Sequence, residues 1–554
     1  MKRHIYIAGT LLLSLATASC GSDYLDTTPT EATSDQAAVS TTAYAYKALN
    51  GCAKSMTIQQ SYFGQGFCGE NAIMRIYENL PSQNYNYNRY ASGWADIHNQ
   101  SMHSNKTTKY DQYAWYYYYQ IISQANTIIA RIDAAEGDEA DKLFIKASAL
   151  TFRAYAYEKL VHYYCERWQD SDNGASQGMP LRLDESTGDL PFSTLAQTMD
   201  QIYADLDEAV KLFGQSGMDR PAGDVWTPNI NVAHAVYARA ALWKQDYSKA
   251  IAEAKAAQDG YPLMNNAAYA AGFCNPTSEW IFGSYGASDE NNWYWAYGVQ
   301  GAANGYYSKA ADTGAGSIGH ELISRIPDND VRKGRFMTAD KFKSLDLTDQ
   351  AQVDQSFAEI APESEDYTEE QKAVNEAVYN EADSLNKLLA VSGLEAPYQS
   401  GYYFLDGQYK FFVTDQPGVG YLPYIRSSEM LLIEAEANYF LGKTAEAQAA
   451  LIALNKDSGR NPEYACSLTG EQLFAEIRDY RCLELWGEGF EWSDFKRRKL
   501  PIVRNTVANG GNAHPAVAVT IQPDEANNWV WITPDNETLY NGGLTGGDGT
   551  EPQP

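Results

Sequence analysis

The chain has 554 residues, of which 44% are hydrophobic, so it has both the length and the apolar content to bury a sizeable core. Its 71 acidic residues outnumber its 42 basic residues, which gives a formal net charge of −29. A surface of this sign repels nucleic-acid phosphates and anionic lipid headgroups, so we expect no nucleic acid as a partner.

The N-terminal residues have the composition of an export signal. A basic start is followed by an apolar run from Ile5 to Leu15, which is too short to cross a bilayer as a permanent anchor. We therefore predict a signal peptide over residues 1–19. The residues before Cys20 resemble a bacterial lipobox, with Thr17 where Leu is usual, and this implies cleavage before Cys20 and attachment of lipid to it. The alternative is a secretory signal followed by an incidental cysteine.

Residues 20–38 are polar and rich in Thr, Asp and Pro, which predicts an extended tether, and a first helix is expected from about 39 to 53. The remaining cysteines are scattered and form no Cys-x-x-Cys pair. That spacing argues against a zinc site and against a dense disulfide framework, although one or two disulfides stay open. These cysteines are Cys52, Cys68, Cys165, Cys274, Cys466 and Cys482.

Residues from about 55 to 110 contain few helical runs and many Asn, Tyr, Gly and Ser, and ordered loops of this length are usually functional. A sugar ring has a face of C–H bonds that stacks on an aromatic plane, and its hydroxyls take hydrogen bonds from planar polar groups. This segment offers both kinds of group. We select Arg75, Trp94 and Asn99 as candidate ligand contacts, and a core position is the alternative for Trp94.

Apolar side chains recur at helical spacing from about 110 to 133 and from about 139 to 167, which predicts a helical hairpin. Five consecutive aromatic residues at 115–119 lie on the first of these helices. Consecutive residues point in different directions around a helix, so we place most of these rings in the core rather than on a binding surface. A further amphipathic helix is predicted from 195 to 213.

Two later stretches match the tetratricopeptide pattern, in which small residues let two paired helices approach closely. The first runs from Ala238 to Pro262, and the second runs from Ala435 to Leu454. We predict a mainly α fold: a tetratricopeptide-like helical-hairpin scaffold with long irregular loop insertions and little β structure. The scaffold is expected to cover about 110–262 and 425–500.

Residues from about 265 to 424 are irregular apart from a strand expected at 278–282. Four aromatic residues fall within five positions from Trp293 to Tyr297, flanked by Asn and Gly, and they cannot all be buried on a short exposed loop. We select Trp293, Trp295 and Tyr297 as a second set of candidate ligand contacts, with a structural role as the alternative for each. The acidic stretch 346–383 is expected to be a solvated face.

Charges of alternating sign fill the stretch from Arg481 to Arg498, beside Leu, Trp and Phe and with two glycines between them. On physical grounds alone this pattern indicates a solvent-exposed helix end with internal pairs such as Arg481 with Glu484. The last residues, 541–554, are rich in Gly and Pro and are expected to form a flexible tail.

Several stretches resemble the motifs of the SusD/RagB family, whose members are outer-membrane lipoproteins of Bacteroidetes that capture nutrients, mostly glycans, for a partner transporter. The matches run from the N-terminus to the last helices, so the resemblance covers most of the chain. They are Asp23–Pro29, Trp94–His98, Ile122–Asn126, Gly178–Leu181, Ser278–Phe282, Leu422–Ala437 and Arg481–Arg498.

The resemblance implies one SusD-like domain over residues 39–540, a lipid anchor in the outer membrane, a surface-exposed body and a SusC-like TonB-dependent transporter as partner. In starch-binding relatives a Trp from the region that corresponds to Trp94 stacks on the ligand, and the region around 291–297 supplies the second face of the site. The resemblance also leads us to expect an internal charged network that joins the C-terminal helix to Arg426, Glu429 and Glu434.

Motifs for catalysis are missing from the sequence. There is no serine-hydrolase elbow, HExxH or phosphate loop, and the seven His residues show no metal-ligand spacing. A glycosidase carboxylate pair is not excluded, but the Glu-rich segments lie in predicted scaffold helices. We therefore predict an oligosaccharide-binding protein with no catalytic residue, metal or cofactor. The alternatives are an oligopeptide-binding uptake protein and an interaction scaffold without a small ligand.

Overall fold

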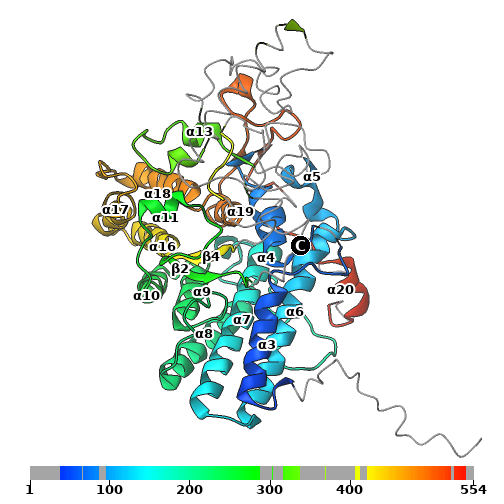
Figure 1. The fold of residues 1–554 in the computed structure, drawn as a ribbon. Coiled ribbons are helices and arrows are strands. Elements are labelled where there is room, and N and C mark those ends of the chain that lie inside the picture. The colour runs from blue at the N-terminus through cyan, green and yellow to red at the C-terminus, as the bar shows by residue number, and fades with distance from the viewer. Residues whose placement is uncertain are drawn as a thin grey trace, which may run out of the picture.

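The computed structural model describes most of the chain (Figure 1). Helices dominate, and the three sheets found in these residues have two strands each. The mainly α fold with little β structure is therefore confirmed. The described residues are 38–64, 66–86, 95–286, 316–336, 406–411, 421–525 and 529–544, with the separate positions 302, 338, 368, 369 and 373.

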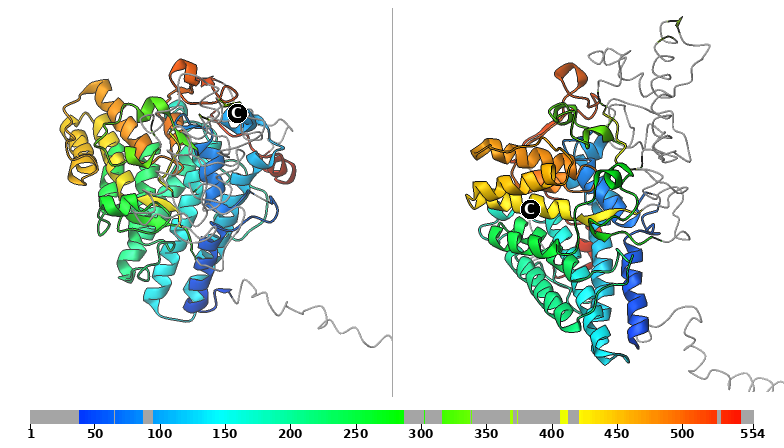
Figure 2. Two further views of the ribbon diagram at one scale, coloured as in Figure 1. Left: turned by 45° about the horizontal axis from the view of Figure 1, so that its top comes forward. Right: turned by 60° about the vertical axis from the view of Figure 1, so that its left-hand side comes forward.

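The scaffold is a series of helices in which each helix packs against the next along the chain, except that the last helix packs against the one two places before it. Its members are α3 (Thr42–Ser55), α6 (Lys109–Arg131), α7 (Glu139–Tyr164), α8 (Leu195–Ser216), α9 (Ile230–Trp243), α10 (Tyr247–Ala257), α16 (Ser427–Phe440), α17 (Thr444–Ile452) and α18 (Gly470–Glu484). Helix α10 packs against α16, so the C-terminal helices continue the series that the N-terminal half begins. The right-hand view of Figure 2 shows the yellow α16 and orange α18 above the green helices. All the predicted scaffold helices are present.

The alanines of the two tetratricopeptide-like patterns are fully buried, and α9 packs against α10 as α16 does against α17. A larger side chain at these positions would overpack the core. The pattern therefore predicted both pairs correctly. The buried residues are Ala238, Ala241, Ala250, Ala254 and Ala257 in the α9–α10 pair, and Ala435, Ala437, Ala447 and Leu451 in the α16–α17 pair.

The aromatic run of α6 lies mostly in the core, as predicted. Trp115, Tyr117 and Tyr118 are buried, whereas Tyr116 is 43% exposed. The hydroxyls of Tyr117 and Tyr118 donate to the buried carboxylate of Glu70, at 3.1 and 3.0 Å. Burial raises the pKa of Glu70. These hydroxyls give the carboxylate the hydrogen bonds that a buried polar group requires.

The prediction of an irregular loop over 55–110 is wrong for its central part, which is helical. Helix α4 (Gly69–Ile73) continues directly into the π-helix η2 (Met74–Asn79), and every residue of both is buried. The apolar residues Ile73, Ile76 and Tyr77 do follow helical spacing, but the polar residues between them are buried as well, and a π-helix departs from the 3.6-residue period. Arg75 therefore lies on a core helix rather than on a loop.

Each sheet is a single antiparallel pair. β1 (Tyr85–Asn86) pairs with β3 (Ser317–Ile318), and β5 (Ile502–Val503) pairs with β6 (Thr520–Ile521). β2 (Trp280–Gly283) pairs with β4 (Pro423–Arg426), which confirms the strand predicted at 278–282. The shorter helices are α5 (Ala95–His98), η3 (Ser101–Ser104), η4 (Ile132–Ala134), η5 (Trp168–Asp170), α11 (Asn266–Ala270), α13 (His320–Ile323), η6 (Lys333–Arg335), η8 (Ala453–Asp457), α19 (Glu491–Arg497), η9 (Val507–Asn509) and α20 (Asp535–Tyr540).

The expectation of a solvent-exposed helix end over 481–498 is wrong. Glu484 is fully buried and contacts Arg332, Arg426 and Arg460 at 3.1, 3.1 and 3.3 Å. Burial alone would raise the pKa of Glu484, but the charges of these three guanidinium groups outweigh it and hold the pKa well below its usual range. Arg481 pairs with Asp494 at 2.5 Å and not with Glu484.

The expected network of Arg426, Glu429 and Glu434 is confirmed for two of its members. Arg426 binds Glu484 of α18, and Glu429 lies 3.9 Å from Arg481. Glu434 instead lies on the face of α16 towards α10, where Gln258 donates to it at 2.7 Å.

Two further expectations concern cysteine chemistry and membrane spans. No disulfide joins the six cysteines that the structure describes, so none of the bridges left open by the sequence forms among them. In the same part of the chain, none of the helices has the length and apolar character needed to cross a membrane.

Candidate ligand-binding platform

The six candidate ligand contacts divide into two groups. Trp94, Trp293, Trp295 and Tyr297 lie outside the described residues, and so does the predicted lipidation site Cys20. Arg75 and Asn99 are described. The described residues that flank the four candidate rings define where these segments join the body of the protein.

Strands β1 and β3 bring the attachment points of both aromatic segments together. Tyr85 is paired with Ile318 and Asn86 with Ser317. In an antiparallel pair the chain leaves one strand at the same end at which it enters the other. The segment with Trp94 therefore starts beside the point where the segment with residues 293–297 ends. We call this pair of strands, with the side chains that hold it, the platform.

The platform is supported by buried aromatic rings. The ring of Tyr85 stacks on that of Trp486, with 4.9 Å between centroids and 11° between planes. The backbone N–H of Gly316 donates to the Tyr85 hydroxyl at 3.1 Å. A Cβ atom on Gly316 would lie 2.2 Å from the Tyr85 ring, so only glycine fits at this position. These rings fix the platform and are too deeply buried to stack on a ligand.

A cluster of polar side chains ties β1 and β3 to two distant parts of the chain. Asn86 donates its side-chain amide to Asn512 at 2.9 Å, and Asn512 donates to the carbonyl of Ile318 at 2.7 Å. Asn512 also donates to Asp406 at 3.0 Å, and Asp406 binds His320 at 2.7 Å. This hydrogen bond with Asp406 raises the pKa of His320. The platform is thus a hydrogen-bonded unit built from four chain segments.

The turn that follows Trp94 is fixed by a buried arginine. Arg504 donates to the carbonyls of His98, Ser82 and Val517, with the last two at 2.6 and 2.9 Å. Asn99 is half-buried and donates its amide to the carbonyl of Ala516 at 3.1 Å. Helix α5 and the C-terminal loop are therefore held together directly beside the first aromatic segment.

Arg75 is 9% exposed and has little surface through which to contact a ligand. Its charge acts on the neighbouring His98. Burial lowers the pKa of His98 well below its usual value, and the charges of Arg504 and Arg75 lower it further. His98 is therefore neutral at physiological pH, and the positive charge beneath α5 comes from the two arginines.

The sequence did not single out Asp406, Arg504 or Asn512. Each belongs to no recognisable short motif, and each has partners that are distant in the sequence. The described residues contain no group of three or more His, Cys, Asp or Glu side chains placed to hold a metal ion. What this arrangement does is hold β1 and β3 together at the ends of the two aromatic segments.

A second surface feature is an open groove of about 420 Å³ beside the end of α13. Its polar side chains bind one another: Asn329 donates to Glu463 at 2.9 Å, and Tyr464 donates to Glu476 at 3.1 Å. Polar groups that are already paired gain little from a ligand. We therefore do not assign the ligand site to this groove.

Comparison with known protein families gives matches over most of the chain. Residues 241–541 match the model of the SusD family, and residues 23–254 match a SusD-like model described as starch-binding and associating with the outer membrane. No curated protein matches the chain significantly.

Solved structures show the same fold at low sequence identity. A SusD-like carbohydrate binding protein from Bacteroides vulgatus is 21% identical, with a TM-score of 0.69 over 91% of this chain and 97% of that one. A SusD superfamily protein from Bacteroides thetaiotaomicron is 20% identical, with a TM-score of 0.64 over 90% and 98%. A laminarin binding SusD-like protein is 18% identical, with a TM-score of 0.53 over 82% and 91%. The expected SusD-like fold is confirmed.

Proposed function

Because the chain belongs to the SusD family, we propose that it binds an oligosaccharide at the cell surface and delivers it to a SusC-like TonB-dependent transporter in the outer membrane. The observation that supports the proposal is the platform, where the segment that leads to Trp94 leaves the body beside the point at which the segment that follows residues 293–297 returns to it. We infer that flat rings from the two segments take a sugar between them, with Asn99, which follows Trp94 closely in the sequence, as a hydrogen-bonding neighbour. The family consists of binding proteins, which agrees with the expectation that this chain is not an enzyme.

The proposed ligand contacts are Trp94, Trp293, Trp295 and Tyr297, with Asn99 as a hydrogen-bonding neighbour. Arg75 contributes through its charge beneath α5 and not through direct contact, since it is buried. Lipid on Cys20 is the proposed anchor, because the residues before it resemble a lipobox and one matching family model is described as associating with the outer membrane.

Trp94→Ala and Trp293→Ala are each expected to weaken oligosaccharide binding at least tenfold, because a stacked aromatic ring at the centre of a site contributes about 2 kcal/mol or more, and about 1.4 kcal/mol corresponds to tenfold. Isothermal titration against a panel of oligosaccharides measures this. Tyr540→Ala is the matched control, since this ring is 83% exposed and lies on α20, outside the platform. Unchanged affinity in both Trp variants would remove these rings from the site.

The same titration separates the alternatives. An oligopeptide-binding protein would bind peptides and no oligosaccharide of the panel. An interaction scaffold would bind neither, and it would retain only the transporter as a partner. Copurification of the tagged chain with a TonB-dependent transporter from outer membranes tests the partner independently of the ligand.

A further inference from the structure

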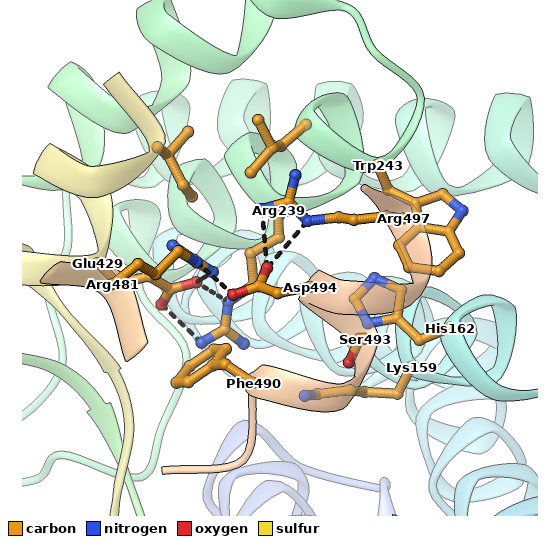
Figure 3. A pocket seen from close by; sticks show the side chains of 12 residues that line it. Lys159, His162, Arg239, Trp243, Glu429, Arg481, Phe490, Ser493, Asp494 and Arg497 are labelled. Carbon is orange, nitrogen blue, oxygen red and sulfur yellow. Dashed lines mark hydrogen bonds and ion pairs between the residues drawn. The ribbon is translucent and has the colours of Figure 1, made fainter. Parts of the chain in front are cut away.

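A small buried pocket lies among the scaffold helices, away from the platform (Figure 3). Its volume is about 20 Å³, and residues of α7, α9, α16, α18 and α19 line it together with Phe490. A pocket of this size holds one water molecule or one monatomic ion. The chemistry of the lining decides which of them fits.

The two carboxylates of the lining are already occupied by arginines. Arg239 donates Nε and Nη2 to Glu429, both at 2.7 Å. Arg481 donates Nε to Asp494 at 2.5 Å, and Arg497 donates to the other oxygen of Asp494 at 2.9 and 2.7 Å. These bonds satisfy the two carboxylates and leave other donors of the same side chains unused.

Three cationic donors of the lining have no acceptor among the described residues. Nη1 of Arg239 and Nη1 of Arg481 are buried and make no hydrogen bond there. Lys159 is 5% exposed, and its ammonium makes no hydrogen bond in that part of the chain but lies 5.8 Å from the Tyr155 ring and 5.7 Å from the Phe490 ring. Its charge also acts on the buried carboxyls of Glu70, Glu78 and Glu158. Figure 3 shows Lys159, Arg239, Arg481 and Phe490 around the pocket. Buried donors of this kind require an acceptor.

The charge of the lining is positive. Lys159, Arg239, Arg481 and Arg497 face two carboxylates, and His162 adds no charge because burial lowers its pKa. Glu158, Glu436 and Arg498 lie behind the lining, and with them the cations still outnumber the carboxylates by five to four.

Two further buried carboxyls, Glu78 and Glu70, interact with Lys159 from outside the lining. Burial raises the pKa of Glu78 to about 7, and it also raises the pKa of Glu70. Burial therefore favours the neutral form of both, and the lining itself keeps four cationic side chains against two carboxylates.

We propose that this pocket is a binding site for one small monovalent inorganic anion of the size of chloride. A water molecule accepts two hydrogen bonds, whereas a halide accepts from all the surrounding N–H groups and also balances the excess positive charge. The volume excludes carboxylate and phosphate ligands. The anion would join α7, α9 and α18 at the centre of the scaffold, independently of any ligand at the platform.

Crystals of the protein grown or soaked in sodium bromide test the proposal directly. The expected result is one anomalous peak between Lys159, Arg239 and Arg481. In solution, urea unfolding in sodium chloride or bromide is compared with sodium acetate at equal ionic strength. Above the dissociation constant, each tenfold rise in halide is expected to lower the unfolding equilibrium constant about tenfold.

Lys159→Met identifies the pocket as the source of the effect. This variant removes the ammonium and nearly keeps the volume of the side chain, so it should lose the bromide peak and the halide dependence. Lys211→Met is the control, since Lys211 is exposed on α8 and should leave both unchanged. Electron density for water alone in bromide crystals, or equal stability of the unmodified protein in halide and acetate, would overturn the proposal.

Discussion

Replacement of Arg426 with methionine is expected to lower the free energy of unfolding by about 4 kcal/mol, because loss of one partner from a buried ionic network leaves the other charges uncompensated. Arg426 is fully buried and donates to three carboxylates that are themselves buried: Glu279 at 2.5 Å, Glu488 at 2.7 Å and Glu484 at 3.1 Å. Methionine fills a similar volume and donates nothing. Urea or thermal unfolding measures the difference.

The matched control is Arg325→Met. The Arg325 side chain is 53% exposed and pairs with Asp479 at 2.8 Å, and exposed pairs of this kind contribute about 0–1 kcal/mol. If both variants unfolded at the same urea concentration, the buried network would have no special role in stability. A large loss for Arg426→Met alone would show that β4, β2 and α18 are held together by this side chain.

The burial of this network could not be predicted from local spacing. Spacing within a helix predicts pairs three or four residues apart, such as Arg481 with Glu484. The partners of Glu484 come instead from residues 332, 426 and 460, and nothing in the sequence around Glu484 indicates them. The resemblance identified Arg426 and Glu429 as network members because it carries information about the whole fold.

The prediction that Glu434 belongs to the charged network is wrong because of the geometry of the helix. Residues two positions apart on an α-helix point about 200° apart, on nearly opposite faces. Glu436, and not Glu434, faces the C-terminal helix, where it binds Arg497 and Arg498. The charges of these two arginines outweigh the effect of burial and lower the pKa of Glu436 to about 2. A motif that contains both glutamates cannot distinguish them without the phase of the helix.

The scaffold was predictable because its signals are local. Residues 109–131 and 139–164 show the helical period that predicted them, and the alanines of the tetratricopeptide-like patterns are buried in two helix pairs. The buried segment 69–79 was missed because its polar residues indicated a loop and because it is partly a π-helix. Composition thus misassigned the core helix that precedes Trp94.

The sequence identified the aromatic segments that we propose as the ligand site, but it did not indicate the strand pair at which one end of each segment meets the body. Trp94 and the rings at 293–297 were selected because flat rings beside amides suit sugars. That one end of each segment lies at the β1–β3 edge depends on a strand pair whose members are more than 200 residues apart. Asn512 and Asp406 complete the platform, and only the folded chain brings them there.

Glu491→Gln is expected to stabilise the protein by about 3–4 kcal/mol at pH 8 and to leave its stability nearly unchanged at pH 4. Glu491 accepts three hydrogen bonds on one oxygen, from the backbone N–H groups of Gln83 and Asn84 and from the Asn84 amide, at 3.1, 2.8 and 3.0 Å. Glutamine keeps that oxygen. Burial raises the pKa of Glu491 to about 7.

The sign follows from the two pKa values of Glu491. Below about pH 4.3 the carboxyl is protonated in both states, so glutamine changes little. Between that pH and about 7 the unfolded chain releases the proton while the folded chain keeps it, so the wild-type protein loses stability as pH rises and Glu491→Gln does not. Unfolding free energies at several pH values test this, with the exposed Glu446→Gln as control. A stability difference that stayed constant from pH 4 to pH 8 would show that the Glu491 carboxyl titrates normally, and that burial beside β1 imposes no electrostatic cost.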